Sequence, residues 1–440
     1  MTQHILLTTL NAKYIHANLG LRYLYANMGE LQPITQLKEY TIKTRPIDIV
    51  EDILQQQPTI VGFGVYIWNI EETFAVVAQL KRIAPEVKII LGGPEVSYES
   101  TAHPIHQFSD YIVTGAADFS FANLCQQIID KRPPISPIIQ SGPIKLDDLQ
   151  YPYQYYSAED LAHRLIYVEA SRGCPFKCEF CLSALDKTSY PFNLDDFLDQ
   201  METLYQRGAR HFKFVDRTFN LKIATTLKIL DFFLAKMSDE LFLHFEVIPD
   251  HLPEKLKEKL KAFPDGSLQF EIGIQTFNPE VQAHISRKQN NEKSKDNLIW
   301  LRQNTHAHIH ADLIFGLPGE TLETFEQSFN QLYACNPHEI QLGILKRLKG
   351  SPIIRHTDEF NIKYNPLPPY NILSNNTVDF LTMQRVNRFA RYWDMIGNSG
   401  RFKNALPLLL SDSPFERFMK ITDWLFAITN QTHQINLKRL

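Results

Sequence analysis

The sequence has few cysteines, no long apolar run and no large excess of one charge. Five cysteines among 440 residues is a sparse and odd number, which argues against a disulfide framework and fits a reducing cytoplasm. No window approaches the roughly 18 apolar residues that a membrane span requires, so we expect no membrane partner. The 45 basic and 49 acidic side chains give a formal net charge of −4. This balance provides no electrostatic reason to expect a nucleic-acid partner.

The N-terminal segment MTQHILLTTLNAKYIH holds only a short apolar run and no small-residue cleavage site. We therefore expect no secretory signal peptide and a cytoplasmic protein. The sequence has no internal repeat, and its 44% hydrophobic and 21% charged residues are ordinary for a folded protein. Because 440 residues exceed one ordinary domain, two or three domains are expected.

Short apolar runs alternate with amphipathic segments over residues 1–135. The expected strands cover residues 4–10, 59–68, 87–94 and 111–115. This alternation predicts an α/β domain built on a doubly wound, Rossmann-like parallel sheet. Ligands of such sheets lie beyond the carboxyl ends of the strands. The turns at Trp68, Gly92–Gly93 and Gly115 are therefore the expected walls of one crevice.

A proline-rich segment predicts a linker over residues 136–160. Strand–helix alternation then resumes over residues 161–365. The six expected strands cover residues 164–171, 211–216, 242–248, 268–275, 309–316 and 340–345. Six such units predict a partial (β/α)6 barrel of the TIM type. Strand patterns fade over residues 366–440, so we expect a small α-helical C-terminal region.

Cys174, Cys178 and Cys181 form a C-x3-C-x2-C pattern in the segment RGCPFKCEFC, directly after the first strand of the predicted barrel. Barrel enzymes hold their chemistry at this carboxyl-end face. A structural zinc site is the simple alternative, but it uses four ligands, usually as two C-x2-C pairs, and the sequence has no second pair. Cys125 and Cys335 lie in helical patterns, where a cysteine is usually buried in a core. Three thiolates in one loop instead suit an iron–sulfur cluster with one iron left without a protein ligand.

The segment RGCPFKCEFC resembles the signature of the radical S-adenosylmethionine (SAM) superfamily, and the resemblance covers about residues 160–350. It implies a 4Fe–4S cluster on Cys174, Cys178 and Cys181 whose open iron binds SAM. It also implies that one electron from the cluster cleaves SAM to a 5′-deoxyadenosyl radical. The cofactors carry this chemistry, so the protein is expected to hold the cluster, orient SAM and exclude water.

The resemblance implies contacts to SAM at the ends of the barrel strands. Phe180 holds the place of an aromatic ring that packs near the adenine, and Gly316 lies in DLIFGLPGE, which resembles the segment that lines the adenine. Asp216, in VDRTFN, is the polar candidate for the SAM amino group, although the usual Gly-Gly-Glu is absent. Glu246 resembles a ribose-binding carboxylate, and Gln275 is a candidate contact to the ribose or the SAM carboxylate. The alternative for each acid is a solvated loop residue.

The first domain resembles the cobalamin-binding domain of cobalamin-dependent radical SAM proteins in the stretches LNAKYIHANLG, FGVYIWNIEET, LGGPEVSY and VTGAADFSF. Glycine permits the backbone to approach a large flat ring closely. The residues implied to lie at the cobalamin are Tyr66, Trp68, Gly92, Gly93, Glu95 and Gly115. The Asp-x-His-x-x-Gly motif that supplies a histidine to cobalt is absent, which implies cobalamin without a histidine ligand. His16 is expected to be a loop residue and not a ligand.

Residues 115–118 read Gly-Ala-Ala-Asp where this group typically shows Gly-Glu-Gly-Glu, so Ala116 and Ala117 remove a carboxylate and a glycine. An alternative is therefore a radical SAM enzyme whose front domain has lost cobalamin and serves substrate binding. The leading hypothesis is cobalamin-dependent methyl transfer to an unactivated centre of a small-molecule substrate, with an electron donor such as flavodoxin or ferredoxin. Some members of the group use cobalamin for ring contraction or cyclisation instead.

Two further classes are disfavoured. Transfer-RNA methylthiolation needs three further cysteines in the front domain, where Cys125 stands alone. An iron–sulfur electron carrier would not need the SAM-type loops.

The basic residues Lys346, Arg347 and Lys349 follow the last expected strand and are candidates to hold an anionic group of the substrate, with a solvated basic loop as the alternative.

Overall fold

The computed structural model describes residues 4–186, 188–433 and 435 of the chain. The chain forms two compact units, and each draws on more than one stretch of the sequence. The first unit comprises Met1–Ser171, Tyr190–Lys213 and Leu348–Gly350, and the second comprises Arg172–Ser189, Phe214–Arg347 and Ser351–Leu440. Among the described residues, no helix is long and apolar enough to cross a lipid bilayer.

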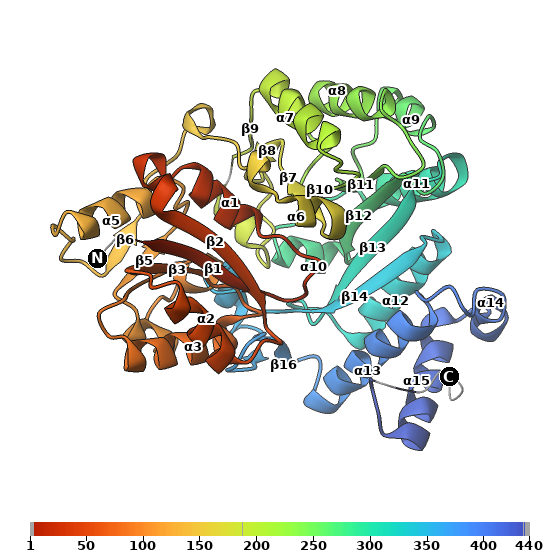
Figure 1. Ribbon diagram of the computed structural model, residues 1–440. Helices are drawn as coiled ribbons and strands as arrows, with labels where there is room; N and C mark the ends of the chain where they lie inside the picture. Colours follow the sequence, from red (N-terminus) through yellow and green to blue (C-terminus); the bar gives the residue numbers. More distant parts are fainter. Residues whose placement is uncertain (1–3, 187, 434, 436–440) are drawn as a thin grey trace. The chain divides into compact units, whose positions relative to one another are not determined.

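Within the described residues, the first unit contains a six-stranded parallel sheet in the order β2-β1-β3-β4-β5-β6 (Figure 1). Its strands are β1 (Ile5–Asn11), β2 (Thr35–Thr41), β3 (Ile60–Gly64), β4 (Lys88–Gly92), β5 (Tyr111–Thr114) and β6 (Ile138–Gln140). The accompanying helices are α1 (Leu19–Ala26), α2 (Pro46–Gln55), α3 (Ile70–Ile83), α4 (Pro94–Ser97), α5 (Ser120–Ile129), α6 (Ala158–His163) and α7 (Leu194–Gln206). Because β1 lies between β2 and β3, the strand order reverses there, which confirms the doubly wound sheet.

Both faces of this sheet are buried, so its central strands are mostly apolar, with Thr8, Thr9 and Asn11 as the polar residues of β1. Leu6 and Leu10 of β1 pack in one core with residues of α2 and α3, and Ile5 and Leu7 pack in another with residues of α1 and α5. Successive side chains of a strand point to opposite faces, so a strand covered on both sides must be apolar at nearly every position. All residues of β1 are accordingly buried.

Two strands of this sheet were not expected from the sequence. β2 has the polar sequence TQLKEYT and lies at one edge, where most of its side chains are only half-buried. β6 is a three-residue edge strand inside the segment that was interpreted as a linker. The strand expected over residues 59–68 ends earlier, at Gly64, and the buried Asn69 side chain then accepts a hydrogen bond from the Tyr66 amide at 2.8 Å, which holds the turn.

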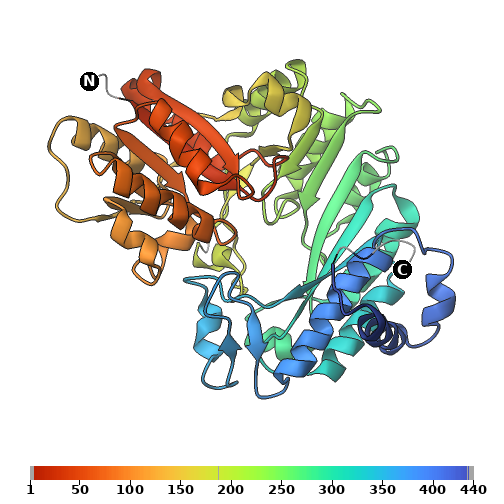
Figure 2. The same cartoon turned by 60° about the horizontal axis from the view of Figure 1, so that its bottom comes forward.

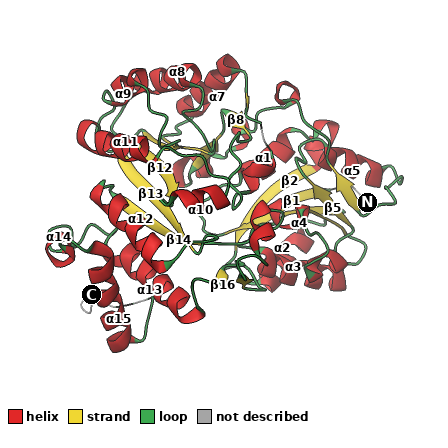
Figure 3. Ribbon diagram, turned by 180° about the vertical axis from the view of Figure 1, so that it is seen from behind, coloured by secondary structure: helices red, strands yellow, loops and turns green. Residues whose placement is uncertain are grey.

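The second sheet, counted over the described ranges, also has six strands, in the order β14-β13-β12-β11-β10-β7. These strands are β7 (Ile166–Val168), β10 (His211–Phe214), β11 (Phe242–Glu246), β12 (Leu268–Gln275), β13 (His308–Phe315) and β14 (Glu339–Ile344). The helices between them along the chain are α7, α8 (Ile223–Leu234), α9 (Glu254–Leu260), α10 (Pro279–His284), α11 (Asn291–Asn304) and α12 (Leu322–Ala334). Neighbours in the sheet follow one another in the chain, and β7 and β14 stand at the two edges, which confirms the partial (β/α)6 barrel (Figure 3).

Strict alternation along β12 and β13 separates the two faces of the second sheet. In LQFEIGIQ, Phe270 and Ile272 are buried, whereas Glu271 and Gln275 are half-buried on the opposite face. Asp312 of β13 follows the same rule. Polar and ionisable side chains therefore gather on one face of the sheet.

The chain ends in the helices α13 (Phe380–Ile396), α14 (Leu406–Leu410) and α15 (Pro414–Thr429), as the sequence predicted. Figure 2 shows these helices in blue beside α12 in cyan. Aromatic rings fill the space between them: the Phe389 ring lies 5.3 Å from that of Phe329 and 4.7 Å from that of Phe415, between ring centroids. Such pairs contribute about 0.5–1.5 kcal/mol each beyond the area that they bury. The remaining elements used below are the 3-10 helix η6 (Pro352–His356) and the short strands β8 (Ser171–Arg172) and β9 (Tyr190–Pro191).

Candidate functional site

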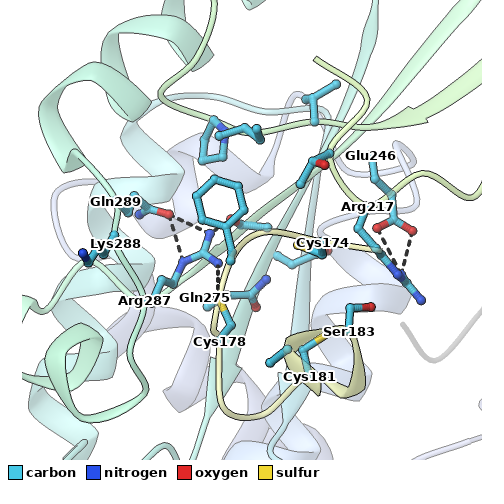
Figure 4. Close-up of a pocket in the computed structure, with 18 of the residues that line it drawn as sticks. Cys174, Cys178, Cys181, Ser183, Arg217, Glu246, Gln275, Arg287, Lys288 and Gln289 are labelled. Carbon is cyan, nitrogen blue, oxygen red and sulfur yellow. Dashed lines mark hydrogen bonds and ion pairs between the residues drawn. The ribbon is translucent and has the colours of Figure 1, made fainter. Parts of the chain in front are cut away.

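A pocket of about 280 Å³ lies at the carboxyl ends of β11 and β12, and every residue that lines it belongs to the second unit (Figure 4). We call residues 173–184, which form one wall, the cysteine loop. The other walls are Arg217 and Thr218 after β10, residues 246–250 at the end of β11, parts of β12 and β13, and residues 287–289. The pocket is therefore built where a parallel barrel places its chemistry.

All three residues of the C-x3-C-x2-C pattern line this pocket. Gly173 begins the loop with a φ of +88°, and a Cβ there would lie 2.0 Å from the Thr188 carbonyl oxygen, so the turn before Cys174 admits only glycine. A structural zinc site uses four ligands, whereas this loop supplies three thiols, so the loop fits a multi-iron cluster with one iron left open better than a zinc ion.

Burial raises the pKa of the Cys174 thiol. Cys125 and Cys335 lie elsewhere, as the sequence predicted: Cys125 belongs to α5 and is fully buried, and Cys335 caps the end of α12 with its Sγ 3.3 Å from the Gln331 carbonyl oxygen.

A buried carboxylate inside the cysteine loop joins the loop to two distant segments. The Glu179 oxygens accept hydrogen bonds from Arg355 at 2.6 and 2.7 Å and from the Ser286 hydroxyl at 2.5 Å, and they lie 3.0 Å from the His356 Nε2. The Glu179 backbone adds two more bonds, from its amide to the Ile285 carbonyl and from the Ile353 amide to its own carbonyl, each at 3.0 Å. A buried carboxylate requires such partners, and here they fix the loop that carries the cysteines.

Three of the five residues predicted to contact SAM line the pocket: Phe180, Glu246 and Gln275. Asp216 is buried outside the pocket lining, where its neighbours Arg217 and Thr218 lie instead, and Gly316 is buried with a φ of +89°. The roles predicted for Asp216 and Gly316 thus have no support from the pocket.

Gln275 has the features of a ligand contact. Its backbone φ is +69°, which is uncommon for a residue with a side chain, and its Oε1 is buried without a hydrogen-bond partner among the described residues. The side chain folds back over Gly273, where a Cβ would lie 2.3 Å from the Gln275 Nε2. A buried acceptor without a donor is costly, so a donor supplied by a bound molecule fits this position.

Arginines that the sequence analysis did not single out complete the pocket. Arg217 donates to both oxygens of Glu246, at 2.9 and 3.0 Å, and this carboxylate raises the pKa of the guanidinium. Arg287 lies beside Cys178, and Lys288 and Gln289 follow it in the lining (Figure 4). The polar run SRKQN between two helical patterns was the available sequence signal.

The residues predicted at cobalamin lie in the first unit, mostly at or just after the carboxyl ends of its strands. Tyr66 and Trp68 follow β3, Gly92 ends β4 and Gly115 follows β5, and these three strands are neighbours. The Tyr66 and Trp68 rings are stacked with centroids 4.5 Å apart, and Trp68 is 44% exposed. An exposed aromatic ring beside exposed glycine backbone fits a large flat ligand.

Contacts within the first unit account for two of the residues predicted at cobalamin. Gly93 has a φ of +106°, and a Cβ there would lie 2.4 Å from the Val65 carbonyl oxygen, so the fold itself requires glycine. Glu95 is buried, and its Oε1 lies 2.8 Å from the Nζ of Lys349, which is also buried. Lys349 is therefore engaged with a carboxylate and does not present its charge to a substrate anion. His16 hydrogen-bonds the Tyr167 hydroxyl at 2.7 Å.

Comparison with known proteins agrees with this layout. Residues 168–332 match the radical SAM superfamily model, residues 5–124 match the B12 binding domain model, and residues 358–440 match a family described as a protein of unknown function (DUF4080). These matches identify a radical SAM domain over residues 168–332 and a B12-binding domain N-terminal to it over residues 5–124. Radical SAM domains use a 4Fe–4S cluster and SAM, and the B12-binding domain adds cobalamin, so the protein is an enzyme with these three cofactors.

Methyltransferases are among the proteins that this chain resembles. The chain is 24% identical over 389 residues to the uncharacterized methyltransferase PH0819 of Pyrococcus horikoshii, covering 82% of each protein. It is 23% identical over 366 residues to the cobalamin-dependent radical SAM methyltransferase TokK of Streptomyces tokunonensis, covering 74% of this chain and 53%, about half, of TokK. The radical SAM methyltransferase TsrM of Kitasatospora setae, solved with cobalamin and a [4Fe-4S] cluster bound, shares the fold with a TM-score of 0.65 at 17% identity, over 82% of this chain and 75% of TsrM.

The cysteine assignment predicts a sharp difference between the five cysteines. Changing Cys174, Cys178 or Cys181 to Ala removes one of three ligands, so we expect the loss of nearly all cluster iron after anaerobic reconstitution, measured as iron per chain and by the visible spectrum. Cys125→Ala and Cys335→Ala are the matched controls and should retain the iron of the wild type. Loss of the cluster in Cys125→Ala with retention in Cys178→Ala would show that the ligand set is wrong.

The contacts of Glu179 predict a smaller effect on how firmly the cluster is held, and not the complete loss of iron expected for the cysteine variants. Glu179→Gln keeps the shape but removes the charge, and charge-assisted hydrogen bonds contribute about 1.5–3 kcal/mol each. We expect iron to pass to an anaerobic chelator roughly tenfold faster than in the wild type. Glu359→Gln is the control, because Glu359 is exposed and reaches the same His356 only at 3.8 Å. Equal release rates in both variants would contradict a positioning role for Glu179.

Proposed function

We propose that the protein is a cobalamin-dependent radical SAM methyltransferase that transfers a methyl group to an unactivated centre of a small-molecule substrate. The observation that carries the proposal is the pocket in which three cysteines lie together with Phe180, Glu246 and Gln275. The B12-binding domain match over residues 5–124 and the methyltransferase names of the relatives supply the second half of the argument.

The bound cofactors supply the electron that cleaves SAM and the methyl group that is transferred. The residues of this chain bind and orient them. Three cysteines hold the cluster and leave one iron open to SAM. The Glu246 carboxylate, held by Arg217, is suited to accept hydrogen bonds from ribose hydroxyls, and the free Oε1 of Gln275 is suited to a further donor of SAM. The Phe180 ring supplies an apolar surface for the adenine.

The small-molecule class of the substrate is supported by a relative of the same fold. TsrM has also been solved with a tryptophan substrate and a SAM analogue, at a TM-score of 0.63 and 17% identity. Flavodoxin or ferredoxin is the proposed electron donor. The alternative enzyme, with a front domain that lacks cobalamin, depends on Ala116 and Ala117, which follow β5 in the loop after Gly115.

Cleavage of SAM tests the radical SAM half of the proposal. Anaerobically reconstituted protein with SAM and dithionite should form 5′-deoxyadenosine, measured by liquid chromatography, and Cys178→Ala should form none. Gln275→Ala should keep its iron and need a higher SAM concentration for the same rate, because it loses a contact to SAM but no cluster ligand. If the rate of the Gln275→Ala protein depended on SAM concentration as in the wild type, a contact between Gln275 and SAM would be contradicted.

Retention of corrin tests the cobalamin half. We expect wild type to retain about one hydroxocobalamin per chain after free ligand is removed, measured by corrin absorbance. Trp68→Ala should retain clearly less, because the exposed ring that covers the ligand is lost. Trp424→Ala is the matched control, since Trp424 is 60% exposed on α15. No retention by the wild type would favour the cobalamin-free alternative.

A further inference from the structure

The guanidinium of Arg287 lies beside one cysteine of the cluster site. Its Nη1 is 3.5 Å from the Cys178 Sγ, a distance typical of an N–H···S hydrogen bond (Figure 4). Arg287 belongs to the short connection between α10 and α11, 109 residues after Cys178 in the chain. The contact therefore arises from tertiary packing.

The direction of this guanidinium is fixed by other acceptors. The Gln289 Oε1 accepts from the Arg287 Nε at 3.1 Å and from the Nη2 at 2.8 Å, and the Nη2 also donates to the Gly273 carbonyl. These contacts hold the plane of the fork and leave the Nη1 directed at the sulfur. The Gln289 side chain is itself held, because its Nε2 donates to the Asn291 Oδ1 at 3.1 Å.

The backbone before Arg287 is also held in place. Ser286 has a φ of +52°, a left-handed conformation that is uncommon for residues other than glycine. Its hydroxyl donates to Glu179 at 2.5 Å, and the Glu179 amide donates to the Ile285 carbonyl at 3.0 Å. Residues in this conformation persist where surrounding contacts determine them, so Arg287 and the cysteine loop form one connected arrangement.

We propose that Arg287 is a redox-tuning residue: it donates an N–H···S hydrogen bond to the Cys178 thiolate and raises the reduction potential of the bound cluster. Reduction adds one electron to a cluster that already carries thiolate charge. A fixed positive charge and an N–H donor at a ligand sulfur stabilise that reduced state. The inference rests on the cluster of the proposed function but is independent of the substrate and of cobalamin.

The test is an anaerobic redox titration of the reconstituted protein without SAM, with dithionite and mediators, followed by electron paramagnetic resonance. At a fixed solution potential, the ratio of reduced to oxidised cluster in Arg287→Gln should be about tenfold lower than in the wild type, which is about 59 mV for a one-electron couple. Arg287→Lys keeps the charge but loses the planar fork, so its potential should lie between those two.

Lys288→Gln is the matched control for charge alone. Lys288 lines the same pocket and carries the same charge as its neighbour, so a much smaller shift in this variant separates the hydrogen bond to sulfur from a general electrostatic effect. Iron per chain is measured first in each protein. If Arg287→Gln does not hold a full cluster, Arg287→Lys and the wild type still give the comparison.

Several results would overturn the proposal. With full iron content, an unchanged potential in Arg287→Gln would contradict the tuning role. An equal shift in Lys288→Gln would show that net charge, and not the hydrogen bond to sulfur, sets the potential. Weaker SAM binding at an unchanged potential makes Arg287 a SAM contact instead. A wild-type protein that binds no cluster would contradict both this inference and the proposed function. A cluster whose potential depends on Arg287, in a protein without methyl transfer, would contradict only the proposed function.

Discussion

The carboxylate of Glu179 joins three parts of the chain that are far apart in the sequence. It lies between two cysteines of the loop, and it binds Ser286 from the connection after α10 and Arg355 and His356 from η6. The cysteine loop has no strand and, before Leu182, no helix, so regular secondary structure does not hold its three cysteines in place. Charge-assisted hydrogen bonds take that role here, and a cluster binds best where its ligands are already placed.

Parallel topology explains why the candidate residues of each unit lie where its strands end. In both sheets the neighbouring strands run in the same direction, so their carboxyl ends meet at one edge and the loops that follow them lie together. Cys174, Arg217, Glu246 and Gln275 come from the ends of successive strands of the barrel. Trp68, Gly92 and Gly115 stand in the same relation to the first sheet. The fold thus brings residues together that no local motif connects.

This geometry also explains how much was predictable. Strands buried on both faces, such as β1, and strict alternation, as in β12, carry a clear periodic signal, so both sheets and the C-terminal helices were predicted. The edge strand β2 was missed because its exposed side chains are polar. The cysteines, Phe180, Glu246 and Gln275 could be named because each lies in a local pattern or directly at a strand end.

Residues whose place depends on tertiary packing could not be found in this way. Arg287 reaches Cys178 across 109 residues, and Arg355 reaches Glu179 across 176. The resemblance of LGGPEVSY to a cobalamin-binding domain implied a ligand contact for Glu95, yet the structure pairs its side chain with Lys349. Gly93 is required by the Val65 backbone, so its presence in the sequence said nothing specific about a flat ring. A glycine or a charged residue can serve the fold or a ligand, and only its contacts distinguish the two.

The two arginines of the pocket illustrate this distinction. Arg217 is paired with the Glu246 carboxylate, so its charge is largely balanced within the site. The oxygens that hold Arg287 are the amide of Gln289 and the carbonyl of Gly273, which are neutral. Unit charges 4 Å apart interact by about 4 kcal/mol at an effective dielectric constant of 20, so a guanidinium that no carboxylate of the described residues binds directly would act strongly on a cluster at the adjacent sulfur. The chemically identical side chains therefore act differently: Arg217 orients a carboxylate, whereas Arg287 directs its charge towards the sulfur of Cys178.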